Sequence, residues 1–147
     1  MKNKGFTIIE LMVVIIIMGV MAGLSVPAIT GSLPNYRLNN DIRNVTNSLI
    51  LARSFSITNG TPYLCTFTQN ASFYTIVKDL NANHVVDAGE PTNTVQLSRN
   101  ISISSATVTI IFSPRGNADV SGNVSLINSK NITRTVFVPL SGTVILP

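Results

Sequence analysis

The sequence predicts an α+β protein in which a long N-terminal α-helix packs on an antiparallel β-sheet domain. Two observations carry this prediction. Up to about residue 60 the apolar residues form first a continuous run and then a helically spaced stripe, whereas after Thr61 apolar and polar residues alternate. The 147 residues fit one domain, and the charged share of 11% is typical of a secreted or surface-exposed β-rich domain.

The start of the chain is divided into a basic leader and an apolar segment. Residues 1–5 contain Lys2 and Lys4, and residues 6–28 are 23 residues with one charge, Glu10. A helix of 23 residues rises about 35 Å, which is enough to cross a hydrocarbon core of about 30 Å. We therefore predict a single-pass transmembrane helix over residues 6–28, with the two lysines on the cytoplasmic side.

Two ordinary explanations of this segment fit less well. A secretory signal has an apolar region of only about 7–15 residues, followed by a small-residue cleavage site. A simple membrane anchor does not explain Glu10, because a carboxylate near the bilayer centre costs about 2.5–3.5 kcal/mol and usually marks a function.

The residues around the leader boundary resemble the prepilin motif of type IV pilins and type II secretion pseudopilins. They are Lys4-Gly5-Phe6-Thr7-Ile8-Ile9-Glu10-Leu11-Met12-Val13-Val14. The resemblance implies a pilin-like fold and cleavage after Gly5 by a prepilin peptidase, followed by methylation of the new N-terminus, Phe6. It also implies that Glu10 pairs with the N-terminal amine of a neighbouring subunit.

The chemistry of these residues fits that implied role. Gly5 leaves the bond to Phe6 unhindered and flexible for a peptidase. Cleavage creates a charged amine at the end of an apolar helix, and the carboxylate of Glu10 can offset that charge in the same chain or in a neighbour. Glu10 would then favour one stagger between subunits.

The helix is expected to continue as an amphipathic segment over residues 29–60. Gly19, Gly23 and Pro27 are expected to interrupt its first part, and Pro34 is expected to form a second break. Asn59-Gly60 is a good C-terminal stop. Five apolar residues recur at helical spacing and predict a stripe that lies on the sheet: Leu38, Ile42, Val45, Leu49 and Ala52.

Residues 61–147 are expected to form the β-rich domain. Residues 63–67 and 73–78 alternate and predict a hairpin that turns at Gln69-Asn70-Ala71. Turn-forming residues separate six further candidate strands: Thr94–Leu97, Ile101–Ile103, Thr107–Phe112, Val124–Leu126, Ile132–Val138 and Thr143–Leu146. The aromatic residues of the hairpin are expected to be core and cross-strand pairs: Tyr63, Phe67, Phe73 and Tyr74.

The C-terminal half is similar to minor pilins and pseudopilins of the GspH/FimT type. The residues concerned are Phe112-Ser113-Pro114-Arg115-Gly116 and the closing Ser141-Gly142-Thr143-Val144. Some members of that family bind DNA during transformation through a C-terminal Gly-Arg-x-Arg pattern. Here Gly142 is followed by Thr143, Val144 and Ile145, so the phosphate contacts are missing and nucleic acid is not the expected partner.

Residues 79–90 have the ligand spacing of an EF-hand calcium loop. Oxygen-bearing side chains stand at positions 1, 3, 5, 9 and 12, which are Asp79, Asn81, Asn83, Asp87 and Glu90. His84 replaces the glycine of position 6, which disfavours the sharp turn, and no flanking helices are evident. The alternative is a polar turn held by Asx-type hydrogen bonds. If calcium binds, the affinity should be near 10⁻⁴–10⁻³ M, as in extracellular modules.

No other constellation in the sequence predicts chemistry. The single cysteine, Cys65, excludes an internal disulfide and a cysteine-based metal site, and its alternating surroundings predict a buried strand thiol. One histidine, His84, gives no catalytic pair with Cys65, and no phosphate-binding loop or further metal motif is present. We therefore expect a protein that is not an enzyme and needs no cofactor, with calcium as the one possible exception.

The leading hypothesis is a minor pilin or pseudopilin that takes part in assembly of a type IV pilus or a type II secretion pseudopilus. Its expected partners are other pilin subunits, the prepilin peptidase and an inner-membrane assembly platform. Its expected location is the bacterial inner membrane, with the C-terminal domain in the periplasm. The alternatives are a pilus-tip adhesin or DNA-uptake receptor, and a tethered β-domain that never assembles.

Overall fold

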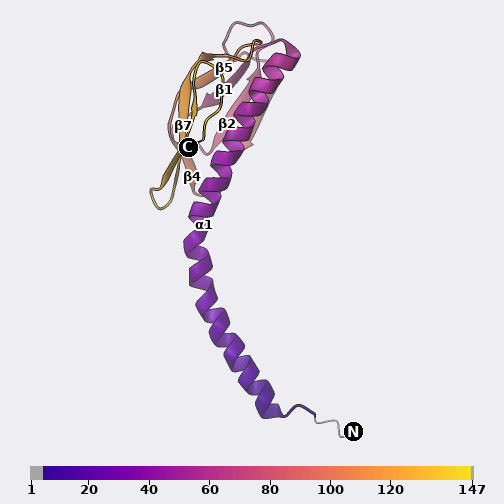
Figure 1. Cartoon of the computed structure of the whole chain (residues 1–147), viewed down its shortest axis with the longest axis vertical. Helices are drawn as coiled ribbons and strands as arrows, with labels where there is room; N and C mark the ends of the chain where they lie inside the picture. Colours follow the sequence, from indigo (N-terminus) through magenta and orange to yellow (C-terminus); the bar gives the residue numbers. More distant parts are fainter. Residues whose placement is uncertain (1–4, 147) are drawn as a thin grey trace. The chain divides into compact units, whose positions relative to one another are not determined.

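A computed structural model of the chain describes residues 5–146, with the backbone alone for residues 24–30. The chain separates into two compact units, Met1–Leu33 and Pro34–Pro147. The leader lysines Lys2 and Lys4 lie outside the described residues. Figure 1 shows helix α1, which is followed along the chain by a β-domain, and this confirms the predicted α+β class.

Helix α1 spans Ile8–Asn59. The predicted interruptions at Gly19, Gly23, Pro27 and Pro34 are wrong, because α1 continues through all four positions. Each proline removes a single N–H donor, and the hydrogen bonds of the neighbouring residues are enough for the helix to continue. The predicted stop is confirmed: α1 ends at Asn59, and Gly60 has the left-handed φ of +65° that a helix end favours.

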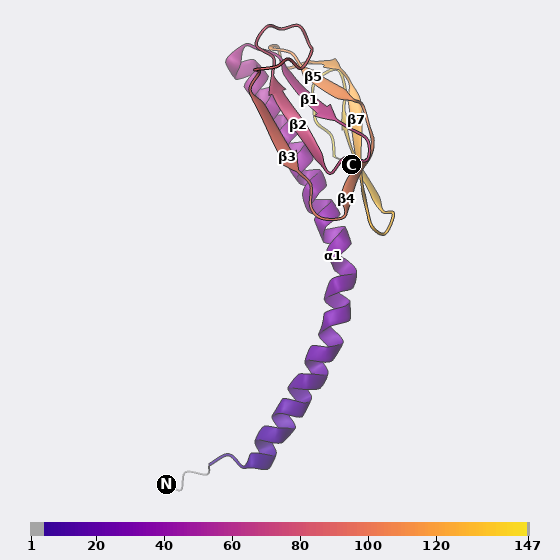
Figure 2. The same cartoon turned by 180° about the vertical axis from the view of Figure 1, so that it is seen from behind.

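The β-domain of the second unit contains two antiparallel sheets. The five-stranded sheet has the order β3-β2-β1-β5-β6, and the three-stranded sheet has the order β4-β7-β8. Figure 2 shows β3, β2 and β1 side by side next to the last turns of α1. The strands are β1 (Tyr63–Phe67), β2 (Phe73–Lys78), β3 (Thr92–Gln96), β4 (Ile101–Ala106), β5 (Thr109–Phe112), β6 (Ala118–Val120), β7 (Gly122–Asn128) and β8 (Thr133–Val138).

The core of this unit forms where the helix stripe meets both sheets. The five predicted stripe residues of α1 are all 2% exposed or less, which confirms the helical spacing argument. They share one apolar cluster with residues of both sheets, including Phe67, Tyr74, Ile103 and Val136. Phe67 and Tyr74 stack with ring centroids 5.4 Å apart, and the Tyr74 hydroxyl lies 2.8 Å from Ser48 Oγ on the helix.

Three features of the β-domain differ from the sequence prediction. Phe73 was expected in the core but is 41% exposed, because side chains alternate along β2 and its neighbour Tyr74 faces the core. The closing strand predicted at Thr143–Leu146 is reduced to a single bridge between Phe137 and Ile145. Strand β6 was not predicted, because its three residues are too few to produce a visible alternation. The hairpin of β1 and β2 is confirmed, with Tyr63 opposite Lys78 and Phe67 opposite Tyr74.

Candidate functional site

The first turn of α1 is built around Thr7 and Glu10. The backbone N–H and the hydroxyl of Thr7 both donate to Glu10 Oε2, each at 3.0 Å, and the Glu10 N–H donates to Thr7 Oγ1 at 3.3 Å. This reciprocal pattern is a capping box, in which the residue before the helix and the third helical residue satisfy each other's N–H groups. Glu10 therefore has a structural role within its own chain.

This cap was not predicted, although the sequence carries its signal. Thr7-Ile8-Ile9-Glu10 is a Thr-x-x-Glu pattern directly before an apolar run, which is the usual mark of a capping box. The pattern coincides with the prepilin motif. The same carboxylate is therefore a candidate both for capping the start of the helix and for pairing with a neighbouring subunit.

The part of the first unit from Phe6 to Met21 exposes its apolar side chains on every side. From Phe6 to Met21 the large apolar side chains are between 46% and 84% exposed. A helix that is apolar all round needs a lipid or protein environment to cover it. Within the described residues, no helix has both the length and the apolar character that are needed to cross a membrane.

Gly5 has no steric role that the described chain explains. A Cβ added at Gly5 would meet no described atom within 4 Å, and the same holds for Gly31 in the same unit. By contrast, Gly142 in the β-domain has no room for a side chain. The described chain therefore places no steric requirement for glycine on position 5.

The second candidate site is the loop of residues 79–90 between β2 and β3. Asp79 is completely buried, and its two carboxylate oxygens accept the N–H groups of Asn83 at 3.3 Å and His84 at 2.8 Å. Glu90 accepts the N–H groups of Leu80 at 2.9 Å and Asp87 at 3.1 Å. The loop is thus closed at both ends by carboxylates that bind backbone N–H groups.

The middle of the loop is held by side-chain amides. Asn81 and Asn83 donate to Asp87 Oδ2 at 2.8 Å and 2.7 Å. These bonds, with that from Asn81 first, hold the pKa of the Asp87 carboxyl below its usual value. Because the folded-state pKa is lowered, this contribution to stability is present at neutral pH and is lost as the pH falls through that pKa.

His84 adopts the turn that its side chain was expected to disfavour. Its φ is +63°, so the left-handed conformation that glycine usually supplies at position 6 is present here without glycine. The bond from its N–H to Asp79 and the approach of its Nε2 to Asp119 Oδ2 at 3.8 Å hold it in place. The left-handed turn is therefore present at position 6, although histidine was expected to disfavour it.

The five predicted calcium ligands lie together in this loop, but they bond to one another and to the backbone. Among the residues described, no group of three or more His, Cys, Asp or Glu side chains is arranged to hold a metal ion. The geometry favours the polar turn over the calcium site. Calcium binding remains a prediction from the ligand spacing.

A single substitution separates these two interpretations of the loop. Asp79→Ala removes the acceptor for two backbone N–H groups, so we expect the free energy of unfolding to fall by about 1–3 kcal/mol, equally with calcium and with chelator. Thermal unfolding followed by circular dichroism measures this, with Asp87→Ala as the half-buried comparison and a smaller expected loss. A rise in the melting temperature at millimolar calcium, abolished by Asp79→Ala, would instead establish the calcium site.

The two stretches that resemble the GspH/FimT type, residues 112–116 and 141–144, contact the last turns of α1. Arg53 Nε donates to the carbonyl of Gly116 at 2.7 Å, and its Nη2 lies 3.4 Å from the carbonyl of Ser141. Ser56 Oγ donates to the carbonyl of Ser113 at 3.0 Å. The two family-like stretches therefore meet at one place on the helix, and their glycines serve packing.

Cys65 is buried, as predicted, at 1% exposure in β1. Burial raises the pKa of its thiol to about 12. The thiolate that would act as a nucleophile or a metal ligand is therefore scarce at neutral pH. Cys65 is therefore a side chain of the apolar core.

Comparison with solved structures shows what fold this is. The minor pseudopilin EpsH from the type 2 secretion system of Vibrio cholerae matches with a TM-score of 0.60 at 12% identity, covering 76% of this chain and 96% of EpsH. The type IV minor pilin FimU of Pseudomonas aeruginosa also matches at 0.60, with 11% identity and coverage of 79% and 91%. Both likenesses establish a pilin-like fold.

Comparison with sequences gives the family. The pilin-like protein PilA1 of Thermus thermophilus is 35% identical over 92 residues, which are 61% of this chain and 57% of that protein's length. A model of the prokaryotic N-terminal methylation motif matches residues 1–26, and the model of type II transport protein GspH matches residues 41–142. Since the second match covers more than half of the chain, the protein belongs to the GspH family and carries a prokaryotic N-terminal methylation motif ahead of the family domain.

Proposed function

We propose that this chain is a minor pilin or pseudopilin, a structural subunit that takes part in assembling a type IV pilus or a type II secretion pseudopilus. The observation that carries the proposal is the order of parts along one chain. A methylation motif over residues 1–26 includes the start of a helix that exposes apolar side chains from Phe6 to Met21, and a GspH-type β-domain follows. The motif gives the maturation, the helix gives the packing element, and the domain gives the outer surface.

The proposed maturation uses the first ten residues. A prepilin peptidase cuts between Gly5 and Phe6, and the new amine of Phe6 is methylated. Residues 6–28 then hold the protein in the inner membrane, with residues 61–147 on the periplasmic side. The apolar side chains between Phe6 and Met21 support this, because lipid or neighbouring helices would cover the surface that they expose.

In the proposed filament, Glu10 offsets the amine of Phe6 from a neighbouring subunit. Its carboxylate is exposed in the single chain and uses Oε2 for the helix cap. A carboxylate accepts several hydrogen bonds, so the cap and an intersubunit pair are compatible. The partners are other pilin-type subunits and the inner-membrane machinery that assembles them. No catalytic step by this chain is part of the proposal.

Gly5→Val tests the maturation directly. A branched side chain beside the scissile bond is expected to block cleavage, so mass spectrometry of the membrane-extracted protein should find residues 1–5 retained and no methyl group on Phe6. Gly31→Val is the matched control, because a Cβ there also meets no described atom within 4 Å, and its processing should be normal. Normal processing of Gly5→Val would contradict the proposed cleavage position.

A further inference from the structure

The charged side chains of the unit that begins at Pro34 are divided between its two ends. Three hydrogen bonds fix one end to the first turns of α1 in this unit. Asn128 donates to Asn35 at 2.9 Å, Arg134 donates to Asn39 at 3.3 Å, and the Ser98 N–H donates to Asp41 at 2.7 Å. We call this end, with its five cations, the basic end: Arg37, Arg43, Arg99, Lys130 and Arg134.

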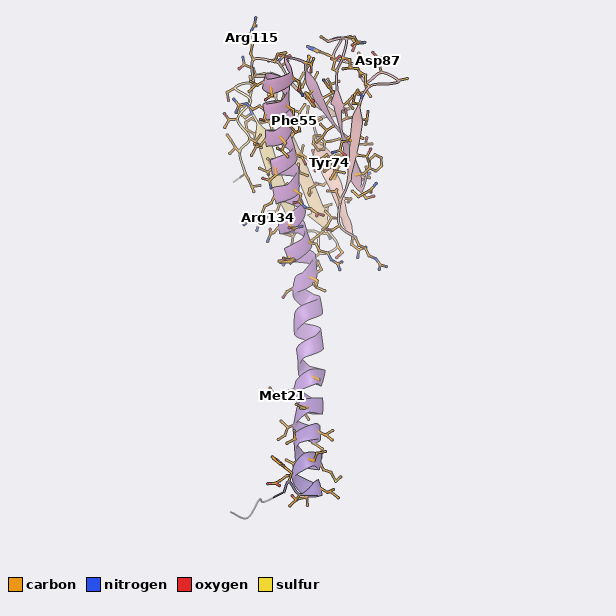
Figure 3. The ribbon with its side chains drawn as sticks, turned by 90° about the vertical axis from the view of Figure 1, so that its right-hand side faces the viewer. Met21, Phe55, Tyr74, Asp87, Arg115 and Arg134 are labelled. Atoms are coloured by element: carbon orange, nitrogen blue, oxygen red, sulfur yellow. The ribbon has the colours of Figure 1, made fainter. Side chains whose placement is uncertain are left out.

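The carboxylates gather at the other end, next to the last turns of α1. The Asp79 N–H donates to the carbonyl of Pro62, just beyond the helix, and His84 joins this loop to Asp119. Asp87 and Glu90 belong to the same loop. Between Arg37 and Asn59 the helix rises about 33 Å, which separates the two ends. Figure 3 shows Asp87 and Arg134 at opposite ends of this unit.

The surface of the basic end contains no exposed carboxylate among the described residues. Of the six acidic residues of the chain, Asp41 alone lies at this end. It is 3% exposed, and its two oxygens accept the N–H and the hydroxyl of Ser98 at 2.7 Å and 2.9 Å. Among the described residues, Asp41 is thus the one acidic side chain at this end, and it is buried, whereas the four arginines and Lys130 carry five positive charges.

The basic end also presents an aromatic side chain and two shallow grooves. Tyr36 is 72% exposed, and one groove of about 340 Å³ runs from it to Arg43 along the helix. A second groove of about 280 Å³ lies between Arg43 and Arg134. Asn39 lines both grooves. Arginines with asparagine amides and a tyrosine are a donor set for phosphate oxygens at a membrane interface.

We propose that the basic end binds the anionic phospholipid headgroups of the membrane that holds the N-terminal helix. This inference rests on the proposed function, because that function supplies the bilayer. Pro34 is the first residue of the unit, so the tether joins it at the basic end. Arg37 follows the proposed membrane segment by nine residues, 28 to 37, or about 14 Å of helix. Cations this close to a surface gain from an anionic headgroup layer.

Two other occupants fit these observations less well. Nucleic acid would find the same cations, but they lie at one end of the unit, where Tyr36 is exposed close to the point of tethering. A second copy could offer its acidic end, but there Asp79 and Glu90 are already bonded to backbone N–H groups. A lipid surface meets the whole basic end at once. Binding would hold the unassembled subunit against the bilayer until assembly extracts it.

The test uses the full chain in nanodiscs with a fluorophore on Asn40→Cys. Asn40 is exposed in the groove beside Tyr36, and the native Cys65 is buried, so labelling is selective. Discs of phosphatidylcholine are compared with discs that also contain phosphatidylglycerol, both with the same share of headgroup-quencher lipid. We expect stronger quenching with the anionic lipid, reversed at high salt because the Debye length falls to about 3 Å at 1 M.

A matched pair of charge variants gives the decisive contrast. The double variant Arg43→Gln with Arg134→Gln should lower the ratio of quenched to unquenched chains on the order of tenfold or more. Lys78→Gln with Arg115→Gln removes the same charge away from the basic end and should leave quenching unchanged. Equal quenching in both discs, or equal loss in both variants, overturns the inference. Binding of short duplex DNA by the same arginines in preference to the discs overturns it in favour of nucleic acid.

Three further outcomes can be distinguished with the same preparation. If quenching with anionic lipid requires discs that hold two chains, the basic end binds a second copy and the lipid inference is wrong. If the chain does not remain with discs of either composition, the proposed membrane anchor fails and the inference falls with it. A chain that remains with both discs but shows no lipid-dependent quenching contradicts the inference alone.

Discussion

Alanine at position 142 is expected to lower the free energy of unfolding by about 3 kcal/mol or more. Gly142 is buried with a φ of +75°, and a non-glycine residue in that region costs about 1–2 kcal/mol. An added Cβ would overlap the carbonyl oxygen of Gly116 and lie 3.1 Å from Arg53 Nε. The carbonyl accepts the bond from Arg53, so it cannot move aside without breaking that bond as well. Urea unfolding of the full chain in detergent measures the loss.

Gly60→Ala is the control for the conformational part of this effect. Gly60 has a similar φ of +65°, but a Cβ there meets no described atom within 4 Å. We therefore expect Gly60→Ala to cost about 1–2 kcal/mol, and the difference between the two variants to report the overlap with Gly116. Equal losses for both variants would show that the packing between Gly116, Gly142 and Arg53 can adjust to the added methyl group.

The sequence predicted those parts of the fold that depend on periodic burial. The stripe from Leu38 to Ala52 was correct because a helix on a sheet must bury one face, and that face recurs every three or four residues. The β1–β2 hairpin was correct because both strands alternate around a short polar turn in which Asn70 takes a φ of +63°. These features are local, so one sequence is enough to specify them.

Features that depend on partners distant in sequence were not predictable in the same way. Thr143–Leu146 has the composition of a strand, but only Ile145 finds a partner, Phe137. Pro34 is typical of a break, but loss of one donor does not end a helix whose neighbours remain bonded. Strand β6 has three residues, and its pairing with β5 decides its state rather than its own pattern.

The candidate sites show the same difference between what a local sequence pattern predicts and what it does not. The positions of Gly5, Phe6 and Glu10 came from a motif, and their roles stay predictions that experiments on assembly must test. The hydrogen bonds of the 79–90 loop were not predictable in detail, because the same side chains can bind calcium or close a turn on themselves. The capping box of Thr7 and Glu10 was predictable from its Thr-x-x-Glu spacing, which lies inside the prepilin motif.

Glu10→Gln is expected to leave processing intact and to reduce incorporation into filaments at least a hundredfold. The bond between Gly5 and Phe6 is unchanged, so cleavage and methylation should continue. A glutamine at this position can still accept the hydrogen bonds of Thr7, so the helix cap is retained. The charge is lost, and an uncompensated amine buried among apolar helices costs about 3–5 kcal/mol. The measurement is the share of the chain that cross-links to other pilin-type subunits in membranes.

Thr7→Ala completes the argument because it makes the opposite change. It removes the hydroxyl of the capping box, at a cost of about 0.5–2 kcal/mol to the helix end, and leaves the Glu10 charge in place. If Glu10 acts by charge across subunits, Thr7→Ala assembles nearly normally and Glu10→Gln does not. If Glu10 acts only as a helix cap, the order is reversed, with Thr7→Ala the more severe. If both variants assemble normally, Glu10 has no part in assembly, and the proposed filament role of the N-terminal segment loses its main support.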